Sequence, residues 1–149
     1  MAPELSVCIR PASPNDLPAI IHLVRTVVHE TYPDLIARNG PPSPGIPDRW
    51  VGALIAEKEL DLVGVGLATS NFISDLWIAE NHRSQGIGAA LLKRLENQIF
   101  ADHTNATLRV VSTNAGARRF YARHSWRETR TYRHERDGHL MIDLEKERP

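Results

Sequence analysis

The fold of this chain is decided by the stretch Asp75-Leu76-Trp77-Ile78-Ala79-Glu80-Asn81-His82-Arg83-Ser84-Gln85-Gly86-Ile87-Gly88. The alternation at its start, with Leu76 and Ile78 on one face, predicts a short strand, and a helix begins directly after the glycine turn. Because Gly86 and Gly88 have no Cβ, the backbone there can adopt a positive φ and approach a ligand closely. The N–H groups of the first helical turn, at the positive end of the helix dipole, form a site for an anion. The stretch therefore predicts a site for a phosphate-bearing ligand.

Periodicity and turn residues predict the elements on both sides of this stretch. Ser13 and Pro14 are typical of a helix start, as N-cap and first helical residue. In the central helix, the apolar spacing leaves Glu96 toward solvent with the other polar side chains. Asp137-Gly138 favours a two-residue hairpin turn. The expected elements are strands over 5–10, 50–56, 62–69, 75–78, 107–112, 128–134 and 139–144, helices over 14–28, 87–99 and 115–124, and a loop over 39–48. This order describes a single α/β domain over residues 1–149.

Composition indicates an ordinary soluble domain. Of the 149 residues, 42% are hydrophobic and 24% are charged, as in most globular proteins. Lys plus Arg and Asp plus Glu are 18 each, so the net charge is zero, and a nucleic-acid partner is not expected. Because no apolar run is long enough for a signal peptide or a membrane span, we expect a cytoplasmic protein without a membrane partner. The single Cys8 excludes an internal disulfide and is expected to be a small buried side chain.

Three motifs make the chain resemble the GNAT superfamily of N-acetyltransferases, which move an acetyl group from acetyl-CoA to an amine. Leu76-Trp77-Ile78 with Arg83-Ser84-Gln85-Gly86-Ile87-Gly88 is similar to the family's strand and its Q/R-x-x-G-x-G/A pyrophosphate loop. Asn114-Ala115-Gly116-Ala117-Arg118-Arg119-Phe120-Tyr121 is similar to the family's N-x-x-A-x-x-F-Y segment. Asp137-Gly138 with Leu140-Met141-Ile142-Asp143-Leu144 resembles its closing strands. The resemblance implies the GNAT fold, an α/β architecture in which about four helices flank a mixed, mostly antiparallel sheet of about seven strands, with strands four and five splayed apart.

Two positions depart from the family pattern. Glu80 stands where a proline often follows the strand, and Ser125 stands before Trp126 where a glycine often ends the second motif. Serine at a helix C′ position costs about 1 kcal/mol relative to glycine if its φ is positive. Neither residue belongs to an expected cofactor contact, so both departures leave the implied cofactor unchanged.

By this resemblance acetyl-CoA is the co-substrate, and its pyrophosphate binds the backbone and the Arg83 side chain of the glycine turn. The alternative is that the glycines only make a tight turn. The pantetheine arm runs along the strand, where a backbone N–H near Ile78 stabilises the developing oxyanion. Asn114 holds the arm from the other side, or caps the following helix, or does both. The expected cofactor-binding residues are Leu76, Trp77, Ile78, Arg83, Ser84, Gln85, Gly86, Ile87, Gly88, Ala89, Asn114 and Tyr121.

Tyr121 is the residue expected to take part in catalysis. The family commonly has a tyrosine here as general acid for the departing thiolate, and a phenol with an ordinary pKa of about 10 suits that task. The alternative is a core aromatic beside Phe120. For the general base, Asp75 comes first by position, although such carboxylates are more often plain surface residues. Other residues that could relay the proton through water are Glu80, His29 and Glu30.

A metal cofactor is not expected. The seven histidines include pairs such as His22 with His29 and His134 with His139, which lack the spacings of common zinc sites. One cysteine cannot complete such a site.

The resemblance implies direct transfer from acetyl-CoA to a primary amine of a small molecule, an amino acid or a peptide, in a ternary complex. One alternative is a non-catalytic CoA-binding regulatory module. Another is a generic phosphate- or nucleotide-binding protein, which the absence of a Walker loop and a Rossmann fingerprint disfavours. Tyr32, Asp34 and Trp50 would offer aromatic and acidic walls to a small cationic amine. Dimerisation is common in the family and stays open for this chain.

Overall fold

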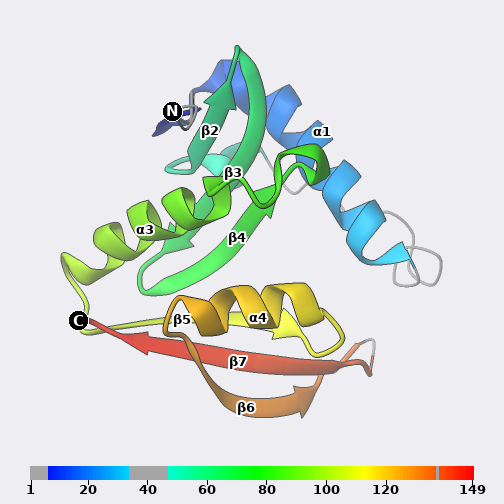
Figure 1. Cartoon of the computed structure of the whole chain (residues 1–149), viewed down its shortest axis with the longest axis vertical. Helices are drawn as coiled ribbons and strands as arrows, with labels where there is room; N and C mark the ends of the chain where they lie inside the picture. Colours follow the sequence, from blue (N-terminus) through cyan, green and yellow to red (C-terminus); the bar gives the residue numbers. More distant parts are fainter. Residues whose placement is uncertain (1–6, 34–46, 137) are drawn as a thin grey trace. The chain divides into compact units, whose positions relative to one another are not determined.

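The computed structural model describes residues 7–33, 47–136 and 138–149 (Figure 1). Short 3₁₀ helices at Pro14–Asp16, Pro47–Trp50 and Glu80–His82 lie between the main elements. In chain order, the main elements are β1 (Val7–Pro11), α1 (Leu17–Thr31), β2 (Leu54–Lys58), β3 (Asp61–Thr69), β4 (Phe72–Ile78), α3 (Ile87–Phe100), β5 (Asn105–Val111), α4 (Ala115–Arg123), β6 (Arg127–Arg133) and β7 (Leu140–Glu147).

The strands form one seven-stranded sheet in the order β1-β2-β3-β4-β5-β7-β6. The pairs β1–β2, β2–β3, β5–β7 and β6–β7 are antiparallel, whereas β4 and β5 are parallel. The register of β4 with β5 is the pair Phe72↔Thr107, at the beginning of β4. A mixed sheet with this order and a parallel β4–β5 pair confirms the predicted α/β GNAT architecture.

The chain groups into two compact units, which are described separately below. The first contains Met1–Leu67 and Asp75–Leu95, and the second contains Ala68–Ser74 and Glu96–Pro149. The boundary falls inside β4, after its paired residue Phe72. A single domain over residues 1–149 stays a prediction.

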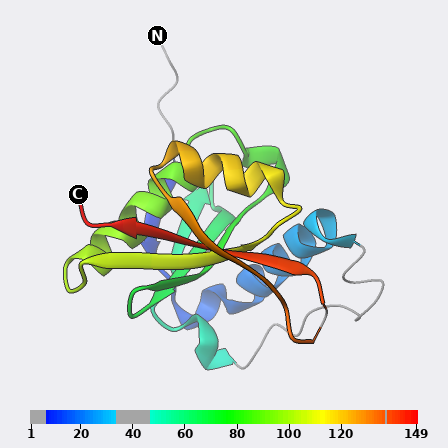
Figure 2. The ribbon, with the colours of Figure 1, turned by 90° about the horizontal axis from the view of Figure 1, so that it is seen from below.

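The core of the first unit forms where α1 packs on one face of its strands (Figure 2). Val65 of β3 points into this core, so its neighbours Gly64 and Gly66 face the other side of the sheet. A Cβ added at Gly64 would lie 2.8 Å from Ile78 Cδ1, and one at Gly66 would lie 2.8 Å from Leu95 Cδ1. These glycines therefore let α3 and β4 pack closely against β3. The buried core residues are Ile20, Leu23, Val24, Val27, Trp50, Ala53, Ile55, Val65 and Leu67.

Ser13 and Pro14 begin a 3₁₀ turn as expected of a helix start, but the α-helix itself begins only at Leu17, three residues later than predicted. The Ser13 N–H donates to Asp16 Oδ2 at 2.7 Å, and the Asp16 N–H donates to the Ser13 carbonyl at 2.9 Å. A 3₁₀ turn over Pro14–Asp16 precedes α1. Arg10 donates two further hydrogen bonds to Asp16, and this guanidinium holds the pKa of the carboxyl well below its usual range. The charged cluster thus fixes the end of β1 to the beginning of α1.

Several boundaries differ from the prediction. Trp50 lies in a 3₁₀ helix and not in a strand, because a turn through Gly52, with φ +87°, precedes β2. The β6–β7 connection is longer than the expected two-residue turn, since the His134 N–H donates to the His139 carbonyl at 2.8 Å. Asp137 and the part of the expected loop over 39–46 lie outside the described residues. Strand β4 begins at Phe72, three residues before the predicted start, because Phe72 pairs with Thr107 of β5.

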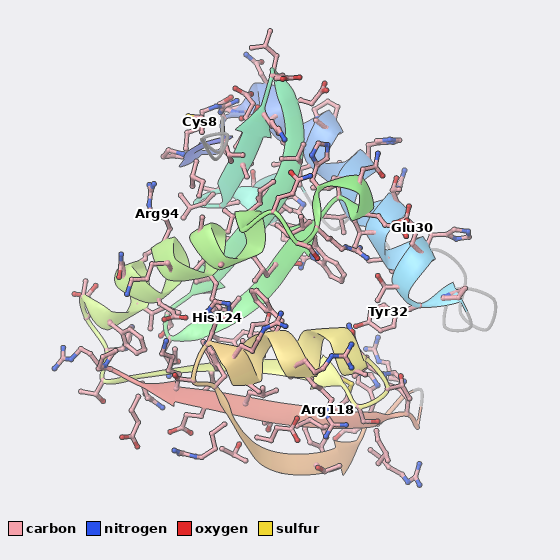
Figure 3. The ribbon with its side chains drawn as sticks, in the orientation of Figure 1. Cys8, Glu30, Tyr32, Arg94, Arg118 and His124 are labelled. Carbon is pink, nitrogen blue, oxygen red and sulfur yellow. The ribbon has the colours of Figure 1, made fainter. Side chains whose placement is uncertain are left out.

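The sequence prediction is wrong about the solvent exposure of two side chains. Cys8 is exposed, because the alternation of β1 places it on the outer side (Figure 3). Glu96 is only 4% exposed although it was expected in solvent. Its Oε1 accepts a hydrogen bond from Lys146 Nζ at 2.6 Å and its Oε2 accepts one from Trp126 Nε1 at 3.3 Å. A buried carboxylate is stable when it is paired in this way.

Candidate functional site

The glycine turn in the first unit has the backbone geometry expected of a phosphate loop. Gly86 has a φ of +83° and Ser84 one of +62°, so the turn uses the left-handed region twice. The first helical hydrogen bond of α3 runs from the Ala90 N–H to the Gly86 carbonyl at 3.0 Å. In helix geometry, the N–H groups of Ile87, Gly88 and the residue after them precede this bond and have no acceptor within the helix. These amides point out of the helix N-terminus, where a phosphate would be bound.

Two cationic side chains lie at this turn. Arg83 Nε donates to the Ile78 carbonyl at 3.2 Å, which ties the turn back to the end of β4. The Arg83 N–H itself donates to the Glu80 carbonyl at 3.2 Å. Lys58, at the end of β2, donates to Gln85 Oε1 at 3.3 Å. The sequence prediction missed Lys58 because its contact with the turn spans 27 positions and carries no local signal.

Asp75 is buried in the first unit and is surrounded by donors. Arg49 Nη2 lies 2.8 Å from its Oδ1 and 2.7 Å from its Oδ2, and Trp77 Nε1 donates to Oδ1 at 3.0 Å. The Arg49 guanidinium also lies over the Trp50 ring, 4.7 Å from its centroid. The carboxylate is 4% exposed, so these donors provide the pairing that a buried charge requires. A general-base role for Asp75 stays a prediction.

We expect Asp75→Asn to lower the free energy of unfolding by about 1–3 kcal/mol, because Arg49 and Trp77 lose their charged acceptor. Urea denaturation measures this effect. Glu80→Gln is the matched control, since Glu80 is exposed in the 3₁₀ helix that follows the same strand and should change stability by less than about 0.5 kcal/mol. An unchanged kcat in the destabilised Asp75 variant would exclude it as the base.

The other candidate bases lie on exposed parts of the first unit. His29 and Glu30 are exposed in the last turn of α1, beside the half-buried Tyr32 (Figure 3). Glu80 is exposed at the start of the 3₁₀ helix that follows β4. Their exposure agrees with plain surface residues as well as with a proton relay through water. Asp34 lies outside the described residues.

Asn114 begins α4 in the second unit. Its Oδ1 accepts a hydrogen bond from the Ala117 N–H at 3.1 Å, so the expected capping role is confirmed. One turn later, Arg118 donates to both carboxylate oxygens of Glu128 in β6, at 2.8 and 2.9 Å. This guanidinium lowers the pKa of the Glu128 carboxyl. These contacts fix α4 against β6, and a role for Asn114 toward a cofactor stays a prediction.

Tyr121 lies in the last turns of α4 and is 7% exposed. Its ring meets Phe120 edge-on at 5.1 Å and Trp126 edge-on at 5.9 Å between centroids. The helix ends in a Schellman motif, in which the Trp126 N–H donates to the Tyr121 carbonyl at 3.0 Å and the Ser125 N–H to the Ala122 carbonyl at 3.2 Å. Ser125 has a φ of +69°, the left-handed value that glycine favours at C′.

Because of this φ, we expect Ser125→Gly to raise the free energy of unfolding by about 1 kcal/mol. Ser125 is exposed, so the substitution removes no packing. Urea denaturation of Ala122→Gly supplies the control, since glycine inside the exposed part of α4 should destabilise by about 1 kcal/mol. If both variants change the free energy of unfolding in the same direction, the backbone at Ser125 is not strained.

No group of His, Cys, Asp or Glu in the described part of the chain is arranged to hold a metal ion. Among the same residues, no helix is both long and apolar enough to cross a membrane.

The chain belongs to the GNAT acetyltransferase family, because residues 51–148 match the family model described as acetyltransferase (GNAT) domain. The resemblance predicted from the motifs is thereby confirmed, and acetyl transfer is the general chemistry of the fold. A search of curated proteins found no match.

Solved structures share this fold at low sequence identity. PaiA N-acetyltransferase from Thermoplasma acidophilum, in complex with coenzyme A, is 19% identical with a TM-score of 0.75, covering 96% of this chain and 99% of its own. YncA from Salmonella typhimurium, with its cofactor acetyl-CoA, is 15% identical with a TM-score of 0.73, covering 95% and 94%. The ribosomal-protein-S18-alanine N-acetyltransferase from Escherichia coli is 19% identical with a TM-score of 0.70, covering 93% and 92%.

Proposed function

We propose that this protein transfers the acetyl group of acetyl-CoA to a primary amine by direct attack in a ternary complex. The glycine turn before α3 is the observation that supports this most strongly. Its left-handed Gly86 and the outward amides at Ile87 and Gly88 suit a pyrophosphate. Membership of an acetyltransferase family makes coenzyme A the ligand whose pyrophosphate fits best, and relatives with coenzyme A or acetyl-CoA bound support the same ligand.

The turn would hold the phosphates through its backbone N–H groups from Ser84 to Ala89. The Arg83 and Lys58 side chains would add positive charge beside them. Along β4, the backbone from Leu76 to Ile78 would bind the pantetheine arm, and the Ile78 N–H would donate to the thioester oxygen as negative charge develops there. Asn114 is proposed as a second contact to the arm.

Acetyl-CoA supplies a thioester carbonyl that a neutral amine can attack. As the amine nitrogen bonds to the carbonyl carbon, the carbon–sulfur bond breaks and the thiolate departs. Tyr121 is proposed to give its phenolic proton to this sulfur. The proton released by the amine passes to a base, for which Asp75 is the first candidate, or to water. The products are an amide and free CoA.

The acceptor is proposed to be an amine of a small molecule, an amino acid or a peptide. Tyr32 in the first unit offers half-buried aromatic surface. Trp50, expected as a second aromatic wall, is 4% exposed and lies in the core of that unit. The relative from Escherichia coli that acetylates an alanine of a ribosomal protein supports a peptide among these classes. Cytoplasmic location and homodimerisation stay predictions.

Release of the CoA thiol from acetyl-CoA against a panel of amines tests the proposed function. Steady release with one class of amine supports transfer and identifies the acceptor class. If acetyl-CoA binds but no amine gives release, the regulatory module that only binds CoA is the better description. If calorimetry detects no acetyl-CoA binding, both functions are wrong.

A further inference from the structure

We propose that Trp126, held by the buried carboxylate of Glu96, is a positioning residue that fixes Tyr121 for proton transfer. This inference rests on the proposed function, in which Tyr121 is the general acid. All the contacts that carry it lie within the second unit.

Trp126 contacts Tyr121 through both backbone and side chain. Its N–H donates to the Tyr121 carbonyl at 3.0 Å, and its ring stands edge-on to the Tyr121 ring with 5.9 Å between centroids. Phe120 contacts Tyr121 edge-on at 5.1 Å and also packs on His124 at 4.7 Å. The phenol ring is thus held by one aromatic from its own helix and one from beyond the helix end.

The indole of Trp126 is itself held by a charge. Trp126 and Glu96 are each 4% exposed, and Trp126 Nε1 donates to Glu96 Oε2 at 3.3 Å. Lys146 Nζ lies 2.6 Å from Glu96 Oε1, with side-chain exposures of 15% for the lysine and 5% for the glutamate. Apolar packing alone would not need this carboxylate, because a buried ion pair adds little net stability. The hydrogen bond from Trp126 Nε1 to this carboxylate does fix the rotation of the indole ring. A Trp126→Phe variant could not form that hydrogen bond.

A fixed indole matters for catalysis because proton transfer requires close geometry. A general acid must reach the atom it protonates within about 2.6–3.2 Å. A misplacement of about 1 Å can cost about 10²-fold in rate. A series of contacts therefore links a buried ion pair to the position of the proposed acid, running from Lys146 through Glu96 and Trp126 to Tyr121.

Trp126→Phe tests this inference, since it keeps an aromatic ring against Tyr121 and removes the N–H that Glu96 holds, together with part of the buried indole ring. We expect kcat to fall by about 10- to 100-fold while the KM for acetyl-CoA changes little. Glu96→Leu should lower kcat in the same way, and Glu96→Gln, which retains an acceptor for the indole, should lower it less. Combining Trp126→Phe with the stabilising Ser125→Gly controls for lost stability: kcat should stay low after the melting temperature is restored.

A double-mutant cycle with Tyr121→Phe separates the outcomes. If Trp126 acts through the phenol, Trp126→Phe should have almost no further effect on kcat once the hydroxyl is gone. An equal loss of kcat in both backgrounds, or full recovery of kcat with Ser125→Gly, would show a structural role only and overturn the inference. If Tyr121→Phe alone leaves kcat unchanged, the acid role in the proposed function fails and the inference fails with it.

Discussion

Tyr121→Phe should lower kcat by about 10²–10⁴, the usual contribution of a positioned general acid. The substitution removes one hydroxyl and keeps the ring that packs between Phe120 and Trp126. The affinity for acetyl-CoA should therefore change little, and so should the melting temperature. Steady-state kinetics with the best amine of the panel measures the fall, and calorimetry measures the affinity.

Phe120→Leu is a suitable comparison, because Phe120 packs on Tyr121 but carries no proton to donate. It should lower stability more than Tyr121→Phe and kcat less. If Tyr121→Phe instead lowers the melting temperature with kcat unchanged, Tyr121 is a core aromatic and nothing more. If kcat falls by less than about tenfold, water or the proton of the attacking amine protonates the thiolate instead.

Gly88→Val should weaken acetyl-CoA binding by about 10- to 150-fold. This corresponds to the loss of a charge-assisted hydrogen bond worth about 1.5–3 kcal/mol. Gly88 lies in the first turn of α3, where a branched side chain blocks a phosphate from the amides. Gly86→Val should weaken binding as well, but its φ of +83° also makes that variant strained. Gly88 is thus the sharper probe.

Two further variants keep the Gly88 result interpretable. Ala90→Val places the same side chain two residues later, at an exposed position, and should leave the affinity near that of the wild type. Gly88→Ala should raise helix stability by up to about 1 kcal/mol and still weaken binding, so stability and affinity would move in opposite directions. Calorimetry on variants with native circular dichroism gives the affinities. An unchanged affinity of Gly88→Val for acetyl-CoA would show that the turn is not part of the cofactor site.

Local patterns were enough to predict most of the fold. The apolar spacing of α3 and the turn at Gly86 depend on residues only a few positions apart, and both are confirmed. Trp50 is predicted as the first residue of a strand over 50–56. In the structure, a 3₁₀ helix buries the same side chain. Burial is therefore no evidence for extended backbone.

The polar partners of the site could not be predicted in this way. Asp75 was identified from its strand, but its partner Arg49 is 26 positions away. Helical spacing predicts Glu96 in solvent. This is wrong because its partner Lys146 is 50 positions away and leaves no local signal in the sequence. Periodicity describes which face of an element is apolar, and it carries no information about a charged side chain that a distant element contributes. The departure at Ser125 could be interpreted from the sequence, because the C′ position of a helix requires a left-handed backbone.

The exposed Cys8 has a practical consequence for every experiment that detects a thiol. Because the chain has one cysteine and its side chain is exposed, a disulfide reagent that reports released CoA will also react with the enzyme. The signal should include a burst of one equivalent per chain, independent of the amine. Under oxidising storage the same sulfur can cross-link two molecules covalently, which would imitate a dimer on a sizing column. Cys8→Ser should abolish the burst and the cross-link together, and any dimer that persists in it would be held by non-covalent contacts.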